Sequence, residues 1–321
     1  MTLHAPEGAK AAIETAIGDR GRVVYLDDAP RAERGELLRE SEALLAWDLQ
    51  TELRDEEWDC LAHLKLVQFL DAGIDGAPLA RLPSTTLVAS NAGAYADAVA
   101  EHALALVLAL AKRLPLRHEE LSEGRFDAEA LSLGLHGRIC AILGFGGIGR
   151  SVARVVRALG MRVFIINRSG TTSEPVDFAG TLDDLEYVLH EAAVIVIALP
   201  LTIRTKNLIG ARELHAMQPD AILVNVARAG IIRQDVLYQH LRLGPCFMAG
   251  LDVWWGEPYA HRQFDCEYPF LSLPNVIGTA HVASNVEGWF ESGVAQAAHN
   301  VRRYLEGEQP AGVVCRDEYE T

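Results

Sequence analysis

The sequence predicts an α/β protein of two domains, each built on a parallel sheet, with a cleft between them. Short apolar runs alternate with amphipathic segments of helical length along the whole chain, which is the pattern of parallel strands joined by crossover helices. Several of these runs are apolar at almost every position, as strands covered on both faces are. The length of 321 residues, half of them hydrophobic, allows two separate cores.

Three strands and one long helix are expected in the first third of the chain. The strands are predicted at residues 22–26, 43–47 and 64–70, with helical or irregular segments between them. A long apolar helix is predicted from about residue 96 to residue 113, and Pro115 follows its end. This part of the chain therefore predicts a small set of βα units.

A second series of strands and helices begins at Arg138 and follows the pattern of a doubly wound domain. Strands are predicted at residues 139–143, 162–166, 194–198, 221–226, 247–253 and 275–278, and helices at 148–159, 182–190 and 234–241. A last helix is predicted at about 285–305. Its periodicity leaves two alternatives open, because it could complete this domain or return to the first one.

The net charge of −15, from 29 Lys and Arg against 44 Asp and Glu, argues against binding to nucleic acid or to anionic membrane surfaces. The same charge repels an anionic ligand at long range. A pocket for a carboxylate must therefore provide a local cation or aligned backbone N–H groups. We expect an arginine in any such pocket.

The cysteines and the first ten residues provide information about the cellular compartment. The five cysteines are scattered and form no CxxC pair, which favours reduced thiols over a disulfide framework or a zinc site; they are Cys60, Cys140, Cys246, Cys266 and Cys315. No metal is expected. The first ten residues lack the pattern of a signal peptide, and no apolar run is long enough to cross a bilayer. We therefore expect a cytoplasmic protein without a membrane segment.

A glycine-rich loop at residues 144–149 follows one predicted strand and opens a predicted helix. Its GxGxxG glycines suit a tight turn, a close approach to a pyrophosphate and close helix packing, and the helix amino terminus offers N–H groups to phosphates. A merely glycine-rich turn is the alternative. The context favours a dinucleotide site in a Rossmann-like domain, with contacts from Gly144, Gly146, Gly147, Ile148 and Gly149.

The end of the next strand bears on the choice between NAD(H) and NADP(H). Asn167, Arg168 and Ser169 follow it, where an NAD-selective site usually places a carboxylate for the ribose 2′-OH. An arginine with polar neighbours can instead bind a 2′-phosphate. The sequence predicts NADP(H) as the preferred cofactor and NAD(H) as the alternative, unless Arg168 is an ordinary solvated loop residue.

Three strand ends in the second half carry Arg228, Glu257 and His281. The carboxyl ends of parallel strands face one crevice, so these side chains can meet there. Reduction of a 2-keto acid requires a cation for the carboxylate and carbonyl, a proton donor for the developing alkoxide, and a hydride. We expect Arg228 to supply the cation and His281 the proton, while Glu257 favours the protonated imidazole and the nicotinamide brings the hydride.

These residues stand in motifs that resemble the D-isomer-specific 2-hydroxyacid dehydrogenase family over nearly the whole chain. The most specific motifs are the glycine loop and residues 199–202, 225–228, 250–253, 257–258 and 273–276 leading to His281. The resemblance implies that Arg228 binds substrate, that His281 is the acid/base and that Glu257 is its partner. It also implies further cofactor contacts from Leu199, Pro200, Thr205, Ala227 and Asp252.

The same resemblance implies a division of labour. Residues 1–95 with 285–321 would form a flavodoxin-like substrate-binding domain, and residues 96–284 the dinucleotide-binding domain. In the first, the N–H groups of Ala72 and Gly73 would bind the substrate carboxylate. Asn91 and Tyr95 are further candidates for the substrate site, Tyr95 because its loop joins the two predicted domains. Two chains would pair as a homodimer through the long helix after Tyr95.

Departures from the family pattern affect the substrate more than the chemistry. Ala229 and Ala280 replace a common glycine and proline, and residues 91–93 replace a common Asn-x-Pro-Gly. Family formate dehydrogenases have glutamine in place of Glu257, and phosphite dehydrogenases have lysine in place of Ala72, so both activities are disfavoured. The residues after the second strand resemble those of NADPH-dependent glyoxylate and hydroxypyruvate reductases.

The sequence thus predicts an oxidoreductase that reduces a small 2-keto acid to the D-2-hydroxy acid, or the reverse. A reductase of a bulkier 2-keto acid is one alternative, and a cofactor-sensing binding protein on a dehydrogenase scaffold is another. The sequence alone does not decide whether nearby aromatic side chains line the pocket or pack in the core; these are Tyr95, Trp254, Trp255 and Trp289.

Overall fold

The computed structural model describes residues 7–257 and 264–319. The chain divides into two compact units, here called unit 1 (Met1–Tyr95 with Val286–Thr321) and unit 2 (Ala96–Asn285). Each unit is an α/β fold with a parallel sheet, as the sequence predicts. The helix predicted at 285–305 is α10 (Trp289–Leu305), and it belongs to unit 1.

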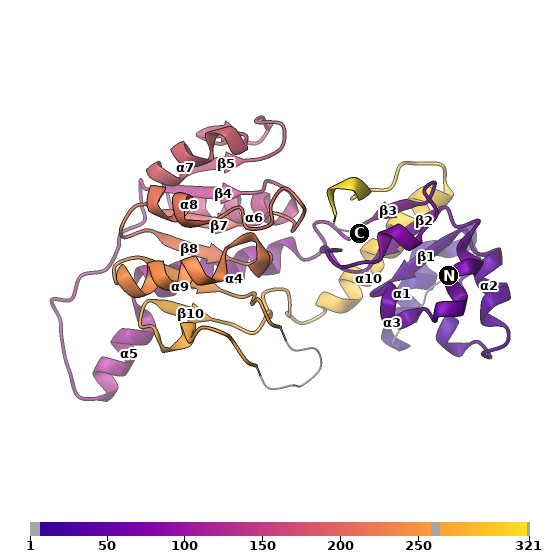
Figure 1. The fold of residues 1–321 in the computed structure, drawn as a ribbon, viewed down its shortest axis with the longest axis horizontal. Helices are drawn as coiled ribbons and strands as arrows, with labels where there is room; N and C mark the ends of the chain where they lie inside the picture. Colours follow the sequence, from indigo (N-terminus) through magenta and orange to yellow (C-terminus); the bar gives the residue numbers. More distant parts are fainter. Residues whose placement is uncertain (1–6, 258–263, 320–321) are drawn as a thin grey trace. The chain divides into compact units, whose positions relative to one another are not determined.

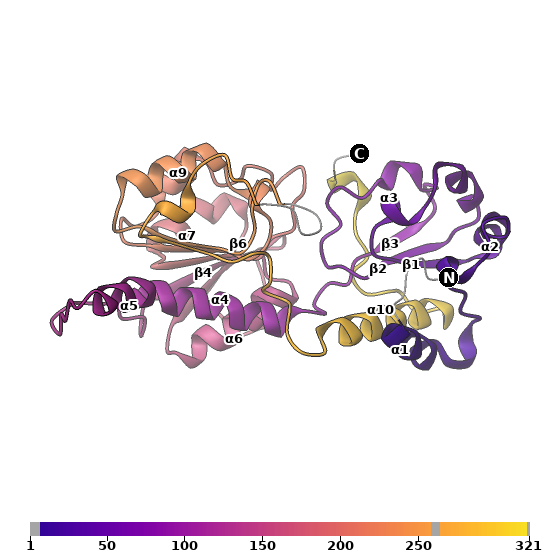
Figure 2. The ribbon, with the colours of Figure 1, turned by 90° about the horizontal axis from the view of Figure 1, so that it is seen from below.

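Unit 1 has a three-stranded parallel sheet in the order β1-β2-β3. Its strands are β1 (Ala43–Ala46), β2 (Leu66–Phe69) and β3 (Leu87–Ala89). On one face lie α1 (Glu7–Ile17) and α10, and on the other lie α2 (Arg34–Glu40) and α3 (Leu49–Glu52) (Figures 1 and 2). Alternate β1 residues point to the two faces, with Leu45 in the α1/α10 core and Leu44 in the α2/α3 core.

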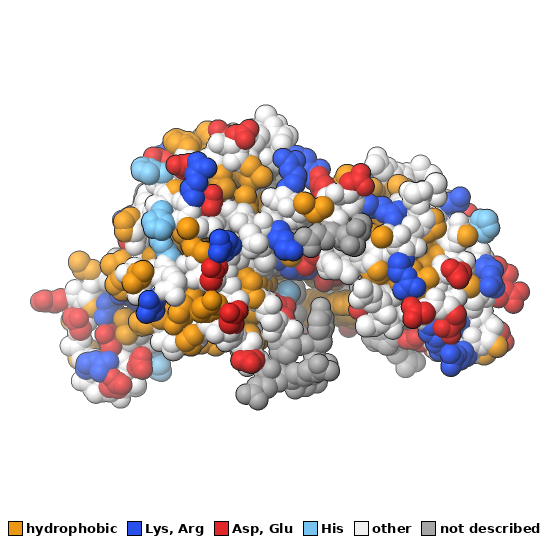
Figure 3. Space-filling model, viewed as in Figure 1, with side chains coloured by type: hydrophobic (Ala, Val, Ile, Leu, Met, Phe, Trp, Pro, Cys, Tyr) orange, Lys and Arg blue, Asp and Glu red, His pale blue; other side chains and the backbone are white. Residues whose placement is uncertain are grey.

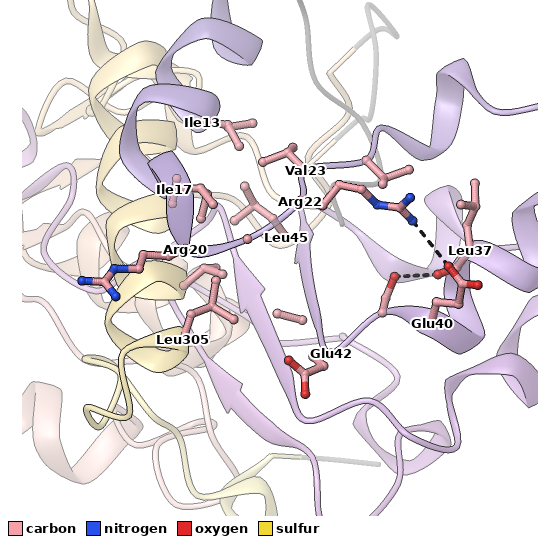
Figure 4. Close-up of a pocket in the computed structure, with 16 residues that line it drawn as sticks. Ile13, Ile17, Arg20, Arg22, Val23, Leu37, Glu40, Glu42, Leu45 and Leu305 are labelled. Atoms are coloured by element: carbon pink, nitrogen blue, oxygen red, sulfur yellow. Dashed lines mark hydrogen bonds and ion pairs between the residues drawn. The ribbon is translucent and has the colours of Figure 1, made fainter.

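The prediction of a strand at 22–26 is wrong. Residues 22–24 carry no regular secondary structure, and a short 3-10 helix follows at Leu26–Asp28. Between this segment and β1 lies a cavity of about 260 Å³, lined by apolar side chains that include Ile17, Val23 and Leu45 (Figure 4). The segment packs by side chains and by the Arg22–Glu40 ion pair at 3.4 Å. Its β-branched residues suit a strand, but apart from a β-bridge at Tyr25 the segment joins neither sheet in the described part of the chain.

Unit 2 has a seven-stranded parallel sheet in the order β10-β9-β8-β7-β4-β5-β6. The strands are β4 (Ile139–Leu143), β5 (Arg162–Ile166), β6 (Phe178–Gly180), β7 (Val194–Ile197), β8 (Ile222–Asn225), β9 (Met248–Leu251) and β10 (Val276–Gly278). The strand order reverses between β4 and β7, and ligands of open α/β sheets bind at such a switch point. Every strand predicted from residue 138 onward is confirmed.

Helices cover both faces of this sheet (Figures 1 and 2). On one face lie α4 (Ala96–Ala111) and α6 (Gly147–Ala158); on the other lie α7 (Leu185–Glu191), α8 (Ala211–Ala216) and α9 (Gln234–Leu243). The short helix α5 (Leu114–Ser122) follows α4 and contains no buried residue. Because both faces are covered, β4, β7 and β8 are buried along their whole length, which explains their apolar sequences.

The surface shows mixed charge. On the face in Figure 3, Lys and Arg side chains lie among Asp and Glu side chains on each unit. Elsewhere on the surface, ion pairs such as Arg150–Glu174 at 2.9 Å bring opposite charges together. No helix in residues 7–257 and 264–319 is long and apolar enough to cross a membrane.

Candidate active site

The glycine loop connects β4, next to the switch point, with α6. Gly144 has a φ of +98°, and a Cβ there would lie 2.5 Å from the Ala198 carbonyl oxygen. A Cβ on Gly149 would lie 2.1 Å from the Gly144 oxygen, so helix and loop can be this close only without a side chain. A Cβ on Gly146 would meet no atom within 4 Å, so this side of the loop is open at the amino terminus of α6. The loop therefore fits a pyrophosphate.

The polar residues after β5 form a compact turn. Asn167 donates through Nδ2 to the Thr171 carbonyl (2.8 Å) and accepts through Oδ1 from the Gly170 N–H (2.7 Å). Ser169 Oγ lies 3.1 Å from the same Thr171 oxygen. Arg168 is exposed between them. Asn167 and Ser169 thus shape the turn that presents Arg168.

The loop after β7 is organised by Thr205, which is buried. Its hydroxyl donates to the Pro200 carbonyl (2.6 Å) and accepts from the Thr202 N–H (2.8 Å). Leu199 is half-buried and Pro200 is exposed. Thr205 therefore holds the shape of this loop from within.

Arg228 follows β8 and is half-buried. The fully buried Asn225 fixes the turn before it, donating through Nδ2 to the Arg228 carbonyl (3.0 Å) and accepting through Oδ1 from the Ala227 N–H (3.1 Å). One guanidinium nitrogen of Arg228 donates to the Ala227 carbonyl at 2.9 Å. The backbone at the end of β8 thereby directs the guanidinium.

Glu257 and His281 form a direct contact within unit 2. His281 Nδ1 lies 2.7 Å from Glu257 Oε2, and the other carboxylate oxygen accepts from the Trp254 N–H at 2.8 Å. The side chain of His281 is 41% exposed, so Nε2 can exchange a proton with a bound molecule. Pro258, which follows Glu257 in the family motif, lies outside the described residues.

The electrostatics of the pair favour an imidazolium beside a carboxylate. The hydrogen bond to Glu257 raises the pKa of His281 above its ordinary value; burial lowers it, the charge of Glu257 raises it, and the charge of Arg228 lowers it. Burial tends to raise the pKa of Glu257, but the His281 hydrogen bond and charge, with Trp254 N–H and Arg228, bring the net pKa below its usual range. Arg228, Glu257 and His281 are therefore electrostatically coupled.

Asp252 is fully buried at the end of β9 and holds the loop that carries His281. Its carboxylate accepts from the N–H groups of Val282 (3.0 Å) and Ala283 (3.1 Å) and from the Thr279 hydroxyl (2.6 Å). Its main-chain oxygen accepts from the His281 N–H at 2.7 Å. The family resemblance implies a cofactor contact for Asp252, but no sequence pattern predicts these hydrogen bonds to the loop.

The residues expected at the substrate in unit 1 lie around the end of β2. The Ala72 N–H, which is expected to bind the substrate carboxylate, donates to the Asp71 carboxylate at 2.7 Å. Asn91 is buried and donates to the Leu70 and Gly293 carbonyls (3.0 and 2.9 Å), and the Tyr95 hydroxyl donates to the same Leu70 oxygen (2.8 Å). Burial raises the pKa of Tyr95 to about 12.

The tryptophans are engaged in packing and hydrogen bonds. The Trp254 indole donates to the Thr279 carbonyl (2.8 Å), and the Trp255 indole donates to the Ile232 carbonyl (2.9 Å) while its ring stacks on Phe270. Trp289 packs edge-on against Tyr95 in unit 1, with ring centroids 5.6 Å apart. Within the described residues, no three His, Cys, Asp or Glu side chains lie together as a metal site requires.

Comparisons with known proteins agree with this chemistry. Residues 104–283 match the NAD-binding domain of D-isomer-specific 2-hydroxyacid dehydrogenases. A glyoxylate reductase from Thermococcus gammatolerans is 30% identical over 299 residues, which cover 90% of this chain and 87% of that protein. A hydroxypyruvate reductase from Thermotoga maritima is 31% identical over 226 residues, covering 70% and 72%.

Among solved structures, a provisionally named formate dehydrogenase from Pyrobaculum aerophilum superposes with a TM-score of 0.84 at 31% identity, covering 99% of both chains. The matched family domain includes the glycine loop, Arg228, Glu257 and His281. The chain therefore belongs to the D-isomer-specific 2-hydroxyacid dehydrogenase family, as an oxidoreductase that acts on CH–OH donors with a nicotinamide cofactor.

Proposed function

We propose that the protein reduces a small 2-keto acid of the glyoxylate or hydroxypyruvate kind to the D-2-hydroxy acid, or catalyses the reverse, and prefers NADP(H) to NAD(H). The observation that carries this proposal is the 2.7 Å contact of His281 with Glu257, coupled to Arg228, in the unit that contains the dinucleotide loop. Unit 2 is the cofactor-binding domain in this proposal, and unit 1 is the substrate-binding domain. The free cysteines favour a cytoplasmic location.

The proposed chemistry divides the work between three side chains. Arg228 binds the substrate carboxylate and polarises the keto oxygen. The bound nicotinamide supplies the hydride to the carbonyl carbon. As the C=O electrons move to oxygen, His281 donates the Nε2 proton to that oxygen, while Glu257 stabilises the imidazolium beforehand.

The substrate class rests on the named relatives, and two features refine it. The names glyoxylate reductase and hydroxypyruvate reductase belong to relatives of about 30% identity. Glu257 occupies the position that is glutamine in family formate dehydrogenases, which disfavours the activity named for the Pyrobaculum structure. Ala72 stands where family phosphite dehydrogenases have lysine, which disfavours that activity as well.

A screen of NADPH oxidation tests this proposal directly. The purified chain is assayed with glyoxylate, hydroxypyruvate, branched-chain and aromatic 2-keto acids, each with NADPH and with NADH. We expect the highest kcat/KM with the two small acids and NADPH. A preference for the larger acids would favour the bulkier-substrate alternative. Tight NADPH binding without turnover of any 2-keto acid would favour the cofactor-sensing binding protein.

Arg168 is the proposed selector of the 2′-phosphate. We expect Arg168→Ala to lower kcat/KM for NADPH by about 10- to 100-fold, the worth of one charge-assisted hydrogen bond, with little change for NADH. Arg242→Ala, at an exposed arginine on α9, is the matched control. Equal losses for both cofactors would remove Arg168 from the selection.

Glu257 is expected to set the pH range of ketone reduction. Reduction requires protonated His281, so kcat falls as the pH rises through the His281 pKa, which Glu257 raises. Glu257→Gln removes the negative charge, so the falling limb of the pH profile should move to lower pH. The pH dependence of kcat, followed by NADPH oxidation, checks this. A limb that stays in place or moves upward would contradict the role of Glu257.

We further propose a homodimer and revise the surface that forms it. Much of α4 is buried inside unit 2 against α6 and the sheet. Large apolar side chains are instead exposed on α5 and the segment after it: Leu121 is 59% exposed, Phe126 84% and Leu131 89%. Such side chains mark an association surface, and a second copy of the chain is the proposed partner.

Two substitutions in this segment test the dimer. We expect the double variant Phe126→Asp with Leu131→Asp to be monomeric by size-exclusion chromatography with light scattering, while the parent chain is dimeric, because burying two carboxylates would cost more than the contact provides. Leu243→Asp changes an equally apolar side chain, 75% exposed on α9, and should leave the dimer intact. A monomeric parent chain would contradict this proposal.

A further inference from the structure

We propose that His102 on α4 is a positioning residue for His281, the proposed proton donor. His102 donates a hydrogen bond to Thr279, and Thr279 donates one to Asp252. These two hydrogen bonds fix the loop that carries His281. The inference rests on the proposed function of His281. It concerns a residue outside the motifs named above and 177 positions away from Thr279.

The first step is the backbone of His281. Its φ is +53°, in the left-handed region that a residue with a Cβ rarely adopts. Such a conformation persists only where the surroundings determine it. His281 therefore depends on the contacts of its loop to keep its ring beside Glu257.

The second step is the set of hydrogen bonds by which Asp252 holds that loop. Three consecutive N–H groups bind this single residue, since the His281 N–H donates to its main-chain oxygen and the Val282 and Ala283 N–H groups donate to its carboxylate. Asp252 is 0% exposed, so a displaced carboxylate would find no water to replace these partners. The direction of the Asp252 side chain consequently fixes the turn at His281.

The third step assigns the direction of the remaining contacts. Thr279 donates its one hydroxyl proton to Asp252 Oδ1 at 2.6 Å. At the 2.9 Å contact with His102 Nε2, the Thr279 oxygen must therefore accept, and His102 must carry a proton on Nε2. The Thr279 carbonyl accepts from the Trp254 indole (2.8 Å), which holds this residue from the other side. The result is two successive hydrogen bonds, in which His102 donates to Thr279 and Thr279 donates to Asp252.

Through these hydrogen bonds, His102 links α4 to the loop that carries His281. Its side chain is 22% exposed, and it projects from the second turn of α4, the helix that runs along one face of the sheet (Figure 2). His102 Nε2 also lies 3.5 Å from Asp252 Oδ1, so the imidazole faces both Thr279 and Asp252. The charged and titratable groups that face His281 itself are Glu257, Arg228 and Asp252.

The test compares variants that remove the donor with variants that keep it. His102→Leu and Thr279→Val remove the hydrogen bonds that link His102 to Asp252, whereas His102→Gln keeps an N–H donor and Thr279→Ser keeps the hydroxyl. We expect the first two to lower kcat by about tenfold or more, since misplacing a catalytic group by 1 Å can cost about a hundredfold. The second two should stay within about threefold of the parent chain. His118→Leu, at an exposed histidine on α5, is the control for loss of an imidazole.

An NMR titration of the His281 ring provides a readout that does not require turnover. The His281 pKa should fall in His102→Leu and Thr279→Val, because the ring moves away from Glu257, and it should be retained in His102→Gln and Thr279→Ser. An unchanged His281 titration and kcat in His102→Leu would overturn the proposal, as would a His102→Gln variant as impaired as His102→Leu. If His102→Leu does not fold, the Thr279→Val and Thr279→Ser pair decides.

The same measurements separate this inference from the proposed function. A parent chain that reduces no 2-keto acid would refute the proposed function, while the NMR titration would still report whether His102 positions His281. Conversely, an active parent chain with an unresponsive His281 ring would refute only the positioning role.

Discussion

Replacement of His281 by alanine is expected to lower kcat for reduction of the 2-keto acid by about 10²- to 10⁴-fold, the usual contribution of a positioned general acid. The Nδ1 atom is held by Glu257 at 2.7 Å, and 41% of the side chain is exposed, so the proton leaves from Nε2 toward the substrate. Without the imidazole, water must protonate the developing alkoxide. Steady-state NADPH oxidation at saturating substrate measures this loss.

Cofactor binding provides the control for this variant. The dinucleotide loop at 144–149 makes none of its described contacts through His281, so the NADPH dissociation constant, measured by fluorescence titration, should change by less than about threefold. His299→Ala, at an exposed histidine on α10, should retain full activity. A His281→Ala variant with normal turnover would remove this residue from the mechanism.

Replacement of Arg228 by alanine is expected to lower kcat/KM for the 2-keto acid by about 10²-fold or more, because the two charge-assisted hydrogen bonds that we propose between Arg228 and the substrate would be lost. Arg228→Lys keeps the charge but not the planar fork, so it should recover only part of the loss. Arg228 also lowers the pKa of His281 through its charge. In Arg228→Ala the falling limb of the pH profile should therefore move to higher pH, opposite to the shift expected for Glu257→Gln.

These opposite shifts make the prediction specific. A structural role for Arg228 would lower activity without moving the pH profile upward. Since the guanidinium also donates to the Ala227 carbonyl, thermal unfolding of Arg228→Ala should be followed in parallel. An unchanged KM and kcat for the 2-keto acid would show that another group binds the carboxylate.

The strands of unit 2 could be predicted closely from the sequence, because a strand buried on both faces is apolar throughout. The ranges 139–143 and 162–166 are those of β4 and β5. The three-residue strands β3 and β6 were not predicted, since three residues are too few to show a periodicity; β10 is equally short in the structure but was predicted as a run of four residues. Residues 22–26 have strand-like composition but join neither of the two described sheets, and composition does not reveal whether a neighbouring strand is present.

At the candidate site, motif reasoning identified Arg228, Glu257 and His281, and the structure brings Glu257 and His281 into contact. It did not identify Thr279 or His102 as partners of Asp252. A histidine on a long apolar helix carries no signal of its partner, because the contact spans 177 residues and is set by how α4 lies on the sheet. The engagement of the Ala72 N–H by Asp71 was also unpredictable, since it depends on a side-chain rotamer.

The return of α10 to unit 1 has a consequence for biosynthesis. Its residues Val294 and Ala297 complete the core around Leu45 and Leu66, and Asn300 donates to the buried Gln68. On the ribosome, the residues of unit 1 up to Tyr95 are made before unit 2 but lack this helix until the whole of unit 2 has been made. Unit 2 is continuous and can fold while translation proceeds, so unit 1, which is begun earlier, can be completed only after unit 2.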